Sequence, residues 1–257
     1  PRACAARAHG LLLGLIRARP GAAGLRLKSL QPGAMASGAG TGLRVGTTVD
    51  RRRPAGIIHL AGLRGLAQWG MEGGGLRIGA GVTYTRIIGE LGDRLPGLAM
   101  ASRTVGSPQI RNRGTVGGNL GSASPAGDAH PVLLATDAVI ELASTSGTRR
   151  LSARDFFIGP KRNAMRKDEL IAAFLVAPAL GPQQFSKVGT RNAMVIAVCS
   201  FALALDPERR HIGTGIGSAA PTPGIRDEAG RFLEGGLAEC PLGEERAPGE
   251  GTGGLRR

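Results

Sequence analysis

Residues 106–128 constrain the fold of this chain more than any other part of its sequence. The stretch is rich in Gly, Ser and Asn, and its apolar residues follow neither a helical nor a strand period. It lies between segments that do show such periods, and it is longer than the ordinary connections of compact domains. Loops of this length usually carry function. The sequence therefore indicates one long loop here, and a functional role is one of its two interpretations.

The residues of this loop suit a dinucleotide. Gly114, Gly117 and Gly118 have no side chains, so backbone N–H groups there can approach a pyrophosphate or a flat ring. Asp128 can accept hydrogen bonds from ribose or ribityl hydroxyls, provided that it is partly exposed. Short hydrogen-bonding side chains stand at four further positions, namely Thr115, Asn119, Ser122 and Ser124. A polar surface loop without a ligand is the alternative interpretation.

The flanking segments mix strands and helices without a regular β-α-β alternation, which predicts the α+β class. Apolar runs predict strands at Gly56–Leu60, Gly75–Gly79, Ala138–Leu142, Thr148–Ser152, Leu170–Val176, Gln184–Val188, Ile196–Leu205 and Ile212–Ser218. Helical spacing predicts helices at Thr83–Leu91, from Pro96 onward, at Pro131–Thr136 and at Arg226–Leu237. Residues 1–36 are rich in Ala, Gly and Arg and do not indicate packed structure.

Charge and hydropathy argue against two classes of protein. The formal net charge of +14 favours nucleic-acid binding, but no aromatic residue interleaves with the dense basic run Arg51–Arg53, so a stacking platform for bases is missing. No apolar run approaches the roughly 18 residues that span a bilayer. The apolar stretch Gly10–Ile16 weakly resembles part of a signal peptide, and we interpret it as a short buried helix or an irregular terminus. We expect neither nucleic-acid binding nor a membrane span.

The cysteines and histidines are scattered and form no metal-ligand pattern. They are Cys4, Cys199, Cys240, His9, His59, His130 and His211. We therefore expect no zinc or iron–sulfur site in this chain. The cysteine usage suits a reduced, cytoplasmic protein.

One segment resembles a known family. Arg111–Asn119 (RNRGTVGGN), followed by Ala123–Pro125 and Asp128, is similar to the FAD motif of the flavoproteins of xanthine dehydrogenases and carbon monoxide dehydrogenases. Further similar segments are Leu76–Arg86, Arg154–Phe157, Asp168–Leu170, Phe185–Lys187 with Arg191, and Gly213–Pro223. The resemblance covers roughly residues 37–237, whereas the sequence before Ser37 departs from the family.

The resemblance implies an α+β fold with two FAD-binding subdomains of the PCMH type, followed by a small α+β domain. On this basis residues 37–178 form the FAD-binding domain and residues 182–240 form a shortened C-terminal domain. Residues 1–36 are a divergent basic segment, and residues 241–257 are a disordered tail. The fold is not a Rossmann fold. Gly215–Ala220 fits the pattern G-x-G-x-x-A, but Pro221–Pro223 follow it instead of a helix, so we treat the match as coincidental.

The resemblance also implies cofactor contacts. Thr115, Val116, Gly117, Gly118 and Asn119 should line the diphosphate and the ribityl chain of FAD. Ser122, Ser124 and Asp128 should hold sugar hydroxyls and phosphate. Val105 and Gly106 match contacts that precede the loop, Leu170 and Ile171 match apolar contacts to the ring system, and Lys187 matches a lysine beside the flavin, although an ordinary lysine at a strand end is the alternative.

The family's first pyrophosphate loop aligns with residues 38–43, where Gly40, Thr41, Gly42 and Leu43 are expected contacts. Ala39 stands where a glycine is usual, and Gly42 offers no side chain. Backbone N–H groups of this loop could still bind phosphate. Arg111 and Arg113 are expected either to pin the loop of residues 106–128 or to face a partner subunit.

The implied function is electron transfer. Substrate would be hydroxylated at a molybdenum cofactor on a large partner subunit, and electrons would pass through two 2Fe-2S clusters on a small subunit to FAD in this chain. NAD or another acceptor would then receive them. No residue of this chain need act as a nucleophile, a general base or a metal ligand. Xanthine dehydrogenase is the preferred type. The alternatives are the medium subunit of a carbon monoxide, aldehyde or heterocycle dehydrogenase, and a degenerate subunit that no longer binds flavin.

Overall fold

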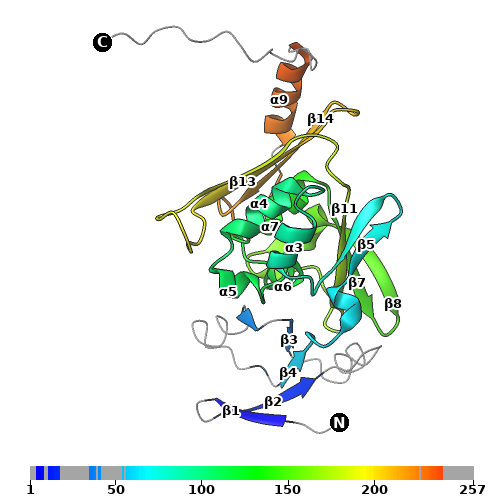
Figure 1. The fold of residues 1–257 in the computed structure, drawn as a ribbon, viewed down its shortest axis with the longest axis vertical. Helices are drawn as coiled ribbons and strands as arrows, with labels where there is room; N and C mark the ends of the chain where they lie inside the picture. Colours follow the sequence, from blue (N-terminus) through cyan, green and yellow to red (C-terminus); the bar gives the residue numbers. More distant parts are fainter. Residues whose placement is uncertain are drawn as a thin grey trace.

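A five-stranded antiparallel sheet with the order β5-β6-β11-β7-β8 forms the centre of the fold (Figure 1). Its strands are β5 (Trp69–Glu72), β6 (Gly75–Gly79), β11 (Leu170–Val176), β7 (Val139–Ser144) and β8 (Gly147–Ser152). All seven residues of β11 are apolar, which suits a central strand. Phe174 pairs in register with Ile78 on one side and Ile140 on the other. The strand that the sequence predicts at residues 170–176 therefore organises the sheet.

The computed structural model describes residues 4–8, 11–17, 35–38, 40–41, 54, 56–225 and 227–239. At the N-terminal end it contains a small sheet with the order β1-β2-β4-β3, in which β2 and β3 each pair with β4 in parallel. The strands are β1 (Cys4–Ala8), β2 (Leu11–Arg17), β3 (Met35–Ser37) and β4 (Gly56–His59). The interpretation of residues 10–16 as a short buried helix or an irregular terminus was wrong, because residues 11–17 form a strand. A short apolar run fits either state, and strand pairing on both sides decides it here.

Helices lie between the five-stranded sheet and a second, three-stranded sheet (Figure 1). They are α3 (Tyr84–Glu90), α4 (Pro96–Thr104), α5 (Pro108–Arg111), α6 (Val116–Ser122) and α7 (Ala129–Ala135). The Thr83 hydroxyl accepts a hydrogen bond from the Arg86 N–H and so caps α3. Pro96 occupies the first turn of α4, where its missing N–H has no cost. Both starts agree with the sequence-based expectation.

Two short helices, α5 and α6, lie inside the stretch that the sequence presents as a loop without periodicity. Ser107 caps α5 and Thr115 caps α6. Glycine lowers helix propensity by about 1 kcal/mol per residue, and α6 contains three glycines within seven residues. Ser107 and Thr115 are residue types that favour N-caps, but the glycines after Thr115 disfavour a helix, so the sequence did not predict α6.

The second sheet is an antiparallel meander of β12 (Gln183–Val188), β13 (Cys199–Asp206) and β14 (His211–Gly217), next to α9 (Asp227–Glu239). Its inner face packs on α4 and α7. A Cβ on Gly213 would lie 1.8 Å from the Ala135 carbonyl oxygen, and a Cβ on Gly215 would lie 2.0 Å from that of Pro131. These glycines therefore let the β14 backbone approach α7. Gly215, the first glycine of the G-x-G-x-x-A match, therefore packs against α7.

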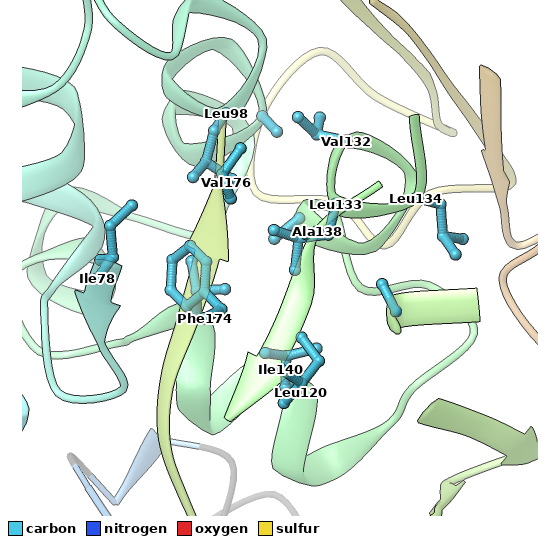
Figure 2. Packing of buried hydrophobic residues seen from close by; sticks show 14 of the residues in the cluster. Ile78, Leu98, Leu120, Val132, Leu133, Leu134, Ala138, Ile140, Phe174 and Val176 are labelled. Carbon is cyan, nitrogen blue, oxygen red and sulfur yellow. The ribbon is translucent and has the colours of Figure 1, made fainter. Parts of the chain in front are cut away.

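The main core lies between the helices and the five-stranded sheet. Figure 2 shows part of it, with Leu98 and Leu120 from the helices pointing toward Ile140 and Phe174 on the sheet. These four side chains are at most 1% exposed. Burial of such side chains contributes about 1.5–3 kcal/mol each.

The fold is α+β, as the sequence predicts, and most predicted elements are present within a few residues of their expected ends. Elements that the sequence did not indicate are short. They are β1 to β3, α5, α6, β5, the 3₁₀ helix η1 (Arg64–Ala67), α8 (Ala153–Phe156) and the hairpin of β9 (Phe157–Gly159) and β10 (Arg162–Asn163).

Candidate functional site

The start of α6 is held in place by α3. The Thr115 hydroxyl accepts a hydrogen bond from the Gly118 N–H at 2.9 Å. The Tyr84 N–H donates to the Gly114 carbonyl at 3.0 Å. The buried Tyr84 ring lies so close that a Cβ on Gly114 would be 3.3 Å from two of its carbons. The beginning of the proposed FAD motif is therefore a fixed helix start rather than a free loop.

The glycines of α6 have two different surroundings. A Cβ on Gly117 would lie 2.4 Å from the Ala80 carbonyl oxygen, so this glycine packs against the end of β6. Gly118 and Gly121 are exposed. A Cβ on Gly121 would meet only Ile171 Cδ1, at 3.8 Å, among the described residues. One side of α6 therefore presents bare backbone toward open space.

The first loop faces this side of α6. It follows β3, and the Leu60 N–H donates to the Ser37 carbonyl at 2.8 Å. A Cβ on Gly38 would lie 3.8 Å from the Thr115 hydroxyl oxygen. Gly40 has a φ of +83°, which only glycine adopts readily, and no described atom would lie within 4 Å of a Cβ there. Two glycine-containing segments from distant parts of the sequence thus approach each other at Gly38 and Thr115.

The structure describes only part of the first loop. Gly40 and Thr41 belong to the described residues, whereas Ala39, Gly42 and Leu43 lie outside them. The contacts expected for Gly42 and Leu43 stay predictions.

Asp128 and Lys187 form a buried ion pair. Lys187 Nζ lies 2.7 Å from Asp128 Oδ2, and the two side chains are 8% and 6% exposed. The Thr104 hydroxyl donates to the same carboxylate oxygen at 3.0 Å. Burial raises the pKa of Asp128 above its usual value, while the hydrogen bond and charge of Lys187 oppose that rise. The expectation of a partly exposed Asp128 was wrong, because β12 covers it with a lysine 59 residues away.

Two side-chain oxygens in this region are fully buried. Asn119 Oδ1 and Asp128 Oδ1 have no hydrogen-bond partner among the described residues. Buried polar atoms are nearly always satisfied, so each such atom requires an explanation. A bound group that carries hydroxyl donors supplies one.

The remaining predicted contacts surround α6. Val105 ends α4, and Arg111 Nη1 donates to the carbonyls of Val105 at 3.2 Å and Gly106 at 2.9 Å, so Arg111 pins the loop from inside. The Ser122 hydroxyl is exposed and donates to the Asn119 carbonyl. The Ser124 hydroxyl accepts from the Ala126 N–H at 3.4 Å. The buried Val116 faces the protein core, so only its backbone can serve a ligand.

Leu170 and Ile171 begin β11, and Ile171 lies near Gly121 at the end of α6. They are 5% and 7% exposed. Both border a cavity of about 470 Å³ that also contacts Arg64 and Leu66 of η1. A volume of this size is within the range of pockets that bind small molecules.

His130 is a buried residue of this region that sequence reasoning missed. A Cβ on Gly127 would lie 2.3 Å from His130 Cε1, so the imidazole lies directly beneath the end of the loop. Burial lowers the pKa of His130 to about 4, although the backbone carbonyls of Asn119 and Ser124 act in the opposite direction. The side chain is therefore neutral at pH 7. A lone histidine in the sequence gives no signal of this kind.

With this geometry in view, comparison with known proteins gives a consistent result. Residues 13–178 match the family described as the FAD binding domain in molybdopterin dehydrogenase. The chain belongs to this family. The match begins at residue 13, so the expectation that everything before Ser37 departs from the family was wrong. The β2 and β3 strands of the small sheet lie in this additional segment.

Curated relatives include FAD subunits of two dehydrogenases. The FAD subunit of nicotinate dehydrogenase from Eubacterium barkeri is 32% identical, over 69% of this chain and 62% of the relative. The FAD-binding subunit of xanthine dehydrogenase from Escherichia coli is 35% identical, over 68% of this chain and 62% of the relative. The chain therefore spans just under two thirds of the length of these relatives.

Solved structures agree on the fold. A chain of a copper- and molybdenum-containing carbon monoxide dehydrogenase superimposes with a TM-score of 0.81 at 26% identity, covering 86% of this chain and 80% of that one. Within the described residues, no helix is both long and apolar enough to cross a membrane.

Proposed function

We propose that this chain binds FAD and transfers electrons as one subunit of a molybdenum hydroxylase. The observation that carries the proposal is the close approach of two glycine-containing segments, the first loop and the start of α6, at Gly38 and Thr115. Family membership favours FAD as the group between them.

The chemistry of the donors present fits this cofactor. The absence of a side chain at Gly40 and at the exposed Gly118 leaves room for a diphosphate, which tolerates no side chain in its path. The unpaired oxygens of Asn119 and Asp128 accept from hydroxyls, which ribityl and ribose groups carry. Apolar Leu170 and Ile171 suit a flat ring system. We therefore keep the predicted set of contacts as proposed contacts.

When bound, FAD would supply the redox chemistry, and the residues of this chain would bind and orient it. The Thr115 hydroxyl accepts a hydrogen bond from the Gly118 N–H and so fixes the first turn of α6, which carries the exposed Gly118. Lys187 keeps Asp128 in one orientation, so that its second oxygen points in a constant direction. No side chain in this region is arranged as a nucleophile with a base, so the chain's own task is positioning and electrostatic tuning.

Partners and substrate type are a further part of the proposal. We propose a molybdenum-binding large subunit and an iron–sulfur small subunit as partners, with NAD or another molecule as electron acceptor, and xanthine dehydrogenase as the preferred type. The similarity to the xanthine dehydrogenase subunit supports this choice. The nicotinate dehydrogenase relative and the carbon monoxide dehydrogenase structure favour the alternative of another heterocycle or carbon monoxide dehydrogenase.

We also propose the domain arrangement and location that the sequence suggests. An FAD-binding domain of two subdomains would end near residue 178, and the three-stranded sheet with α9 would form the smaller C-terminal domain of residues 182–240. The scattered cysteines support a cytoplasmic protein.

The test is flavin content. The chain is co-expressed with the subunits encoded beside it, the complex is purified, and the flavin released by denaturation is identified by chromatography and quantified by absorbance. We expect about one FAD per chain, as a single site implies. A folded but colourless protein would instead support the degenerate subunit.

A further inference from the structure

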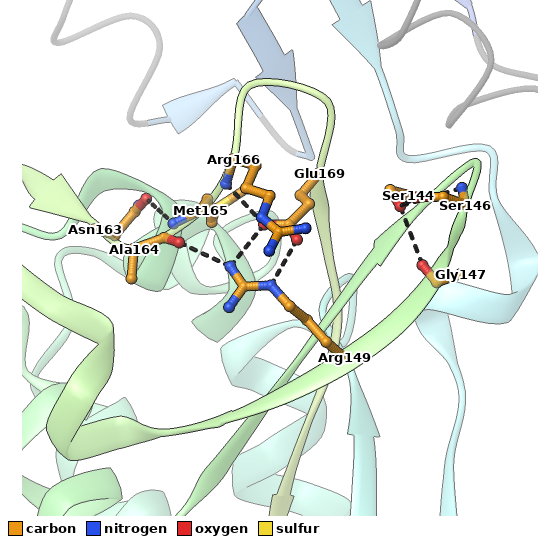
Figure 3. Close-up of polar contacts among 9 residues, drawn as sticks. All are labelled: Ser144, Ser146, Gly147, Arg149, Asn163, Ala164, Met165, Arg166 and Glu169. Atoms are coloured by element: carbon orange, nitrogen blue, oxygen red, sulfur yellow. Dashed lines mark hydrogen bonds and ion pairs between the residues drawn. The ribbon is translucent and has the colours of Figure 1, made fainter.

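The loop of residues 160–169 connects two parts of the proposed site (Figure 3). Near its start, Asn163 Nδ2 donates to the backbone carbonyl of Gly121 at 3.1 Å, at the end of α6. At its other end Glu169 precedes Leu170, the first residue of β11. The loop therefore touches both the glycine helix and the strand that carries the proposed ring contacts.

One arginine holds both ends of this loop. Arg149 reaches from β8 and donates to Glu169 twice, from Nε to Oε1 at 2.7 Å and from Nη2 to Oε2 at 3.0 Å. The same Nη2 donates to the carbonyl of Ala164, the neighbour of Asn163, at 2.9 Å. The Arg166 N–H donates to Glu169 at 2.7 Å. Figure 3 shows these contacts converging on the Arg149 guanidinium and the Glu169 carboxylate.

Burial makes this pair rigid. Glu169 is only 3% exposed, so its charge depends on these donors. The hydrogen bond from Arg149 lowers the pKa of the Glu169 carboxyl below its usual value. A guanidinium fork that binds a carboxylate with two parallel bonds fixes orientation as well as distance.

We propose that Arg149, Glu169 and Asn163 form a clamp that sets the separation between the end of α6 and the start of β11, and that this separation positions the flavin. The proposal rests on the proposed function, since it concerns the same site. The separation is small, because a Cβ on Gly121 would lie 3.8 Å from Ile171 Cδ1. Asn163 contacts backbone carbonyls at the end of α6, and Arg149 and Glu169 act through the loop that leads to Leu170. We propose no contact between these three residues and the flavin, so they are positioning residues.

A matched control stands next to Arg149 in the same strand. Arg150 also forms ion pairs, with Glu72 and with Glu141 at 3.3 Å. These partners lie on β5 and β7, and neither belongs to the loop of residues 160–169. Loss of Arg150 removes an arginine and its ion pairs from the same strand without releasing the clamp.

The experiment compares Arg149→Met, Arg149→Lys, Asn163→Ala and Arg150→Met in the complete complex. FAD is stripped and titrated back to give Kd, the visible circular dichroism of the bound flavin reports its surroundings, and melting of the stripped complex reports stability. We expect Kd to rise about 10- to 100-fold in Arg149→Met, the size that supporting partners of a bound group typically show. The lysine should rescue part of this loss, since it keeps the charge without the fork.

Arg150→Met should change Kd by less than about twofold and leave the flavin dichroism unchanged, as expected for an exposed ion pair. Equal Kd values and equal dichroism in Arg149→Met and Arg150→Met would overturn the clamp. Should Arg149→Met fail to fold, Asn163→Ala decides, because it removes the contact to Gly121 and leaves the buried pair intact. A wild-type complex that binds no FAD would overturn the proposed function, and the clamp with it. Binding by wild type with unaltered variants would overturn the clamp alone.

Discussion

Two glycine-rich segments of this chain look alike in sequence and have opposite roles in the structure. In β14, the inner sides of Gly213 and Gly215 are filled by backbone oxygens of α7, at hypothetical Cβ distances of 1.8 and 2.0 Å. In α6, Gly118 is exposed, and a Cβ there would come no closer than 3.2 Å to the Thr115 hydroxyl. One segment uses missing side chains to pack protein on protein, and the other leaves backbone open to a ligand.

The comparison shows that the role of a glycine-rich segment depends on which atoms lie opposite its glycines. Both segments contact α7. The ion pair of Lys187 on β12 with Asp128 at the start of α7 links the sheet that contains β14 to the loop that follows α6. We expect the β14 glycines to contribute to stability and the exposed α6 glycines to contribute to FAD binding. Substitutions can therefore separate the two roles.

The largest effect should come from cutting the link between the regions. Lys187→Met leaves the Asp128 carboxylate buried without its cation, which typically costs about 3–5 kcal/mol of unfolding free energy. Urea unfolding measures this loss. Lys167→Met, at an exposed lysine, should stay within about 0.5 kcal/mol of wild type. Equal stability of the two variants would show that the link is not structural.

Acid should weaken the shared helix α7 through His130. Its folded pKa is about 4, below the usual 6.5, so the unfolded chain binds the proton more tightly. The stabilisation is complete above pH 6.5 and is lost as the pH falls toward 4. This loss amounts to roughly 3 kcal/mol at most for one proton. Unfolding free energies measured between pH 7 and pH 4 should fall less steeply in His130→Gln. Parallel profiles would contradict the buried neutral imidazole.

An added methyl group in β14 should lower the stability of the protein without changing its affinity for FAD. Gly213→Ala forces β14 away from the Ala135 carbonyl, and overpacking of this kind costs about 1–3 kcal/mol. Thermal unfolding of the flavin-free protein measures the cost. Gly89→Ala, on the exposed side of α3 where no described atom would lie within 4 Å of the new Cβ, should be neutral or stabilising. A fully stable Gly213→Ala that had lost FAD would reverse the comparison.

The smallest energetic effect should come from a substitution in α6, which we expect to lower the affinity for FAD without lowering stability. Gly118→Val places a side chain on the open surface of α6 and should weaken FAD binding about tenfold, which corresponds to about 1.4 kcal/mol. The unfolding free energy of the flavin-free protein should not fall, since valine has a higher helix propensity than glycine. Flavin titration and urea unfolding of the same preparation separate the two quantities. Unchanged affinity would exclude this surface from the site.

Much of the fold could be predicted from the sequence because its signals are local. The all-apolar β11 and the Thr83 cap of α3 are examples. Helix α6 was missed because its glycines oppose the helix that its Thr115 cap begins. The ion pair of Asp128 could not be predicted, since Lys187 lies 59 residues away on β12 and no local pattern encodes such a contact. The FAD motif itself was recognisable, whereas the burial of its last residue depended on tertiary packing.

The central claim is that FAD lies against the open glycines of α6 and not against those of β14. Backbone hydrogen exchange with and without FAD, followed by mass spectrometry of peptides, tests it directly. The account predicts slower exchange on FAD binding in peptides that cover residues 35–41 and 115–122, with no change in residues 211–217. Slower exchange in residues 211–217 alone, with residues 115–122 unaffected, would contradict it.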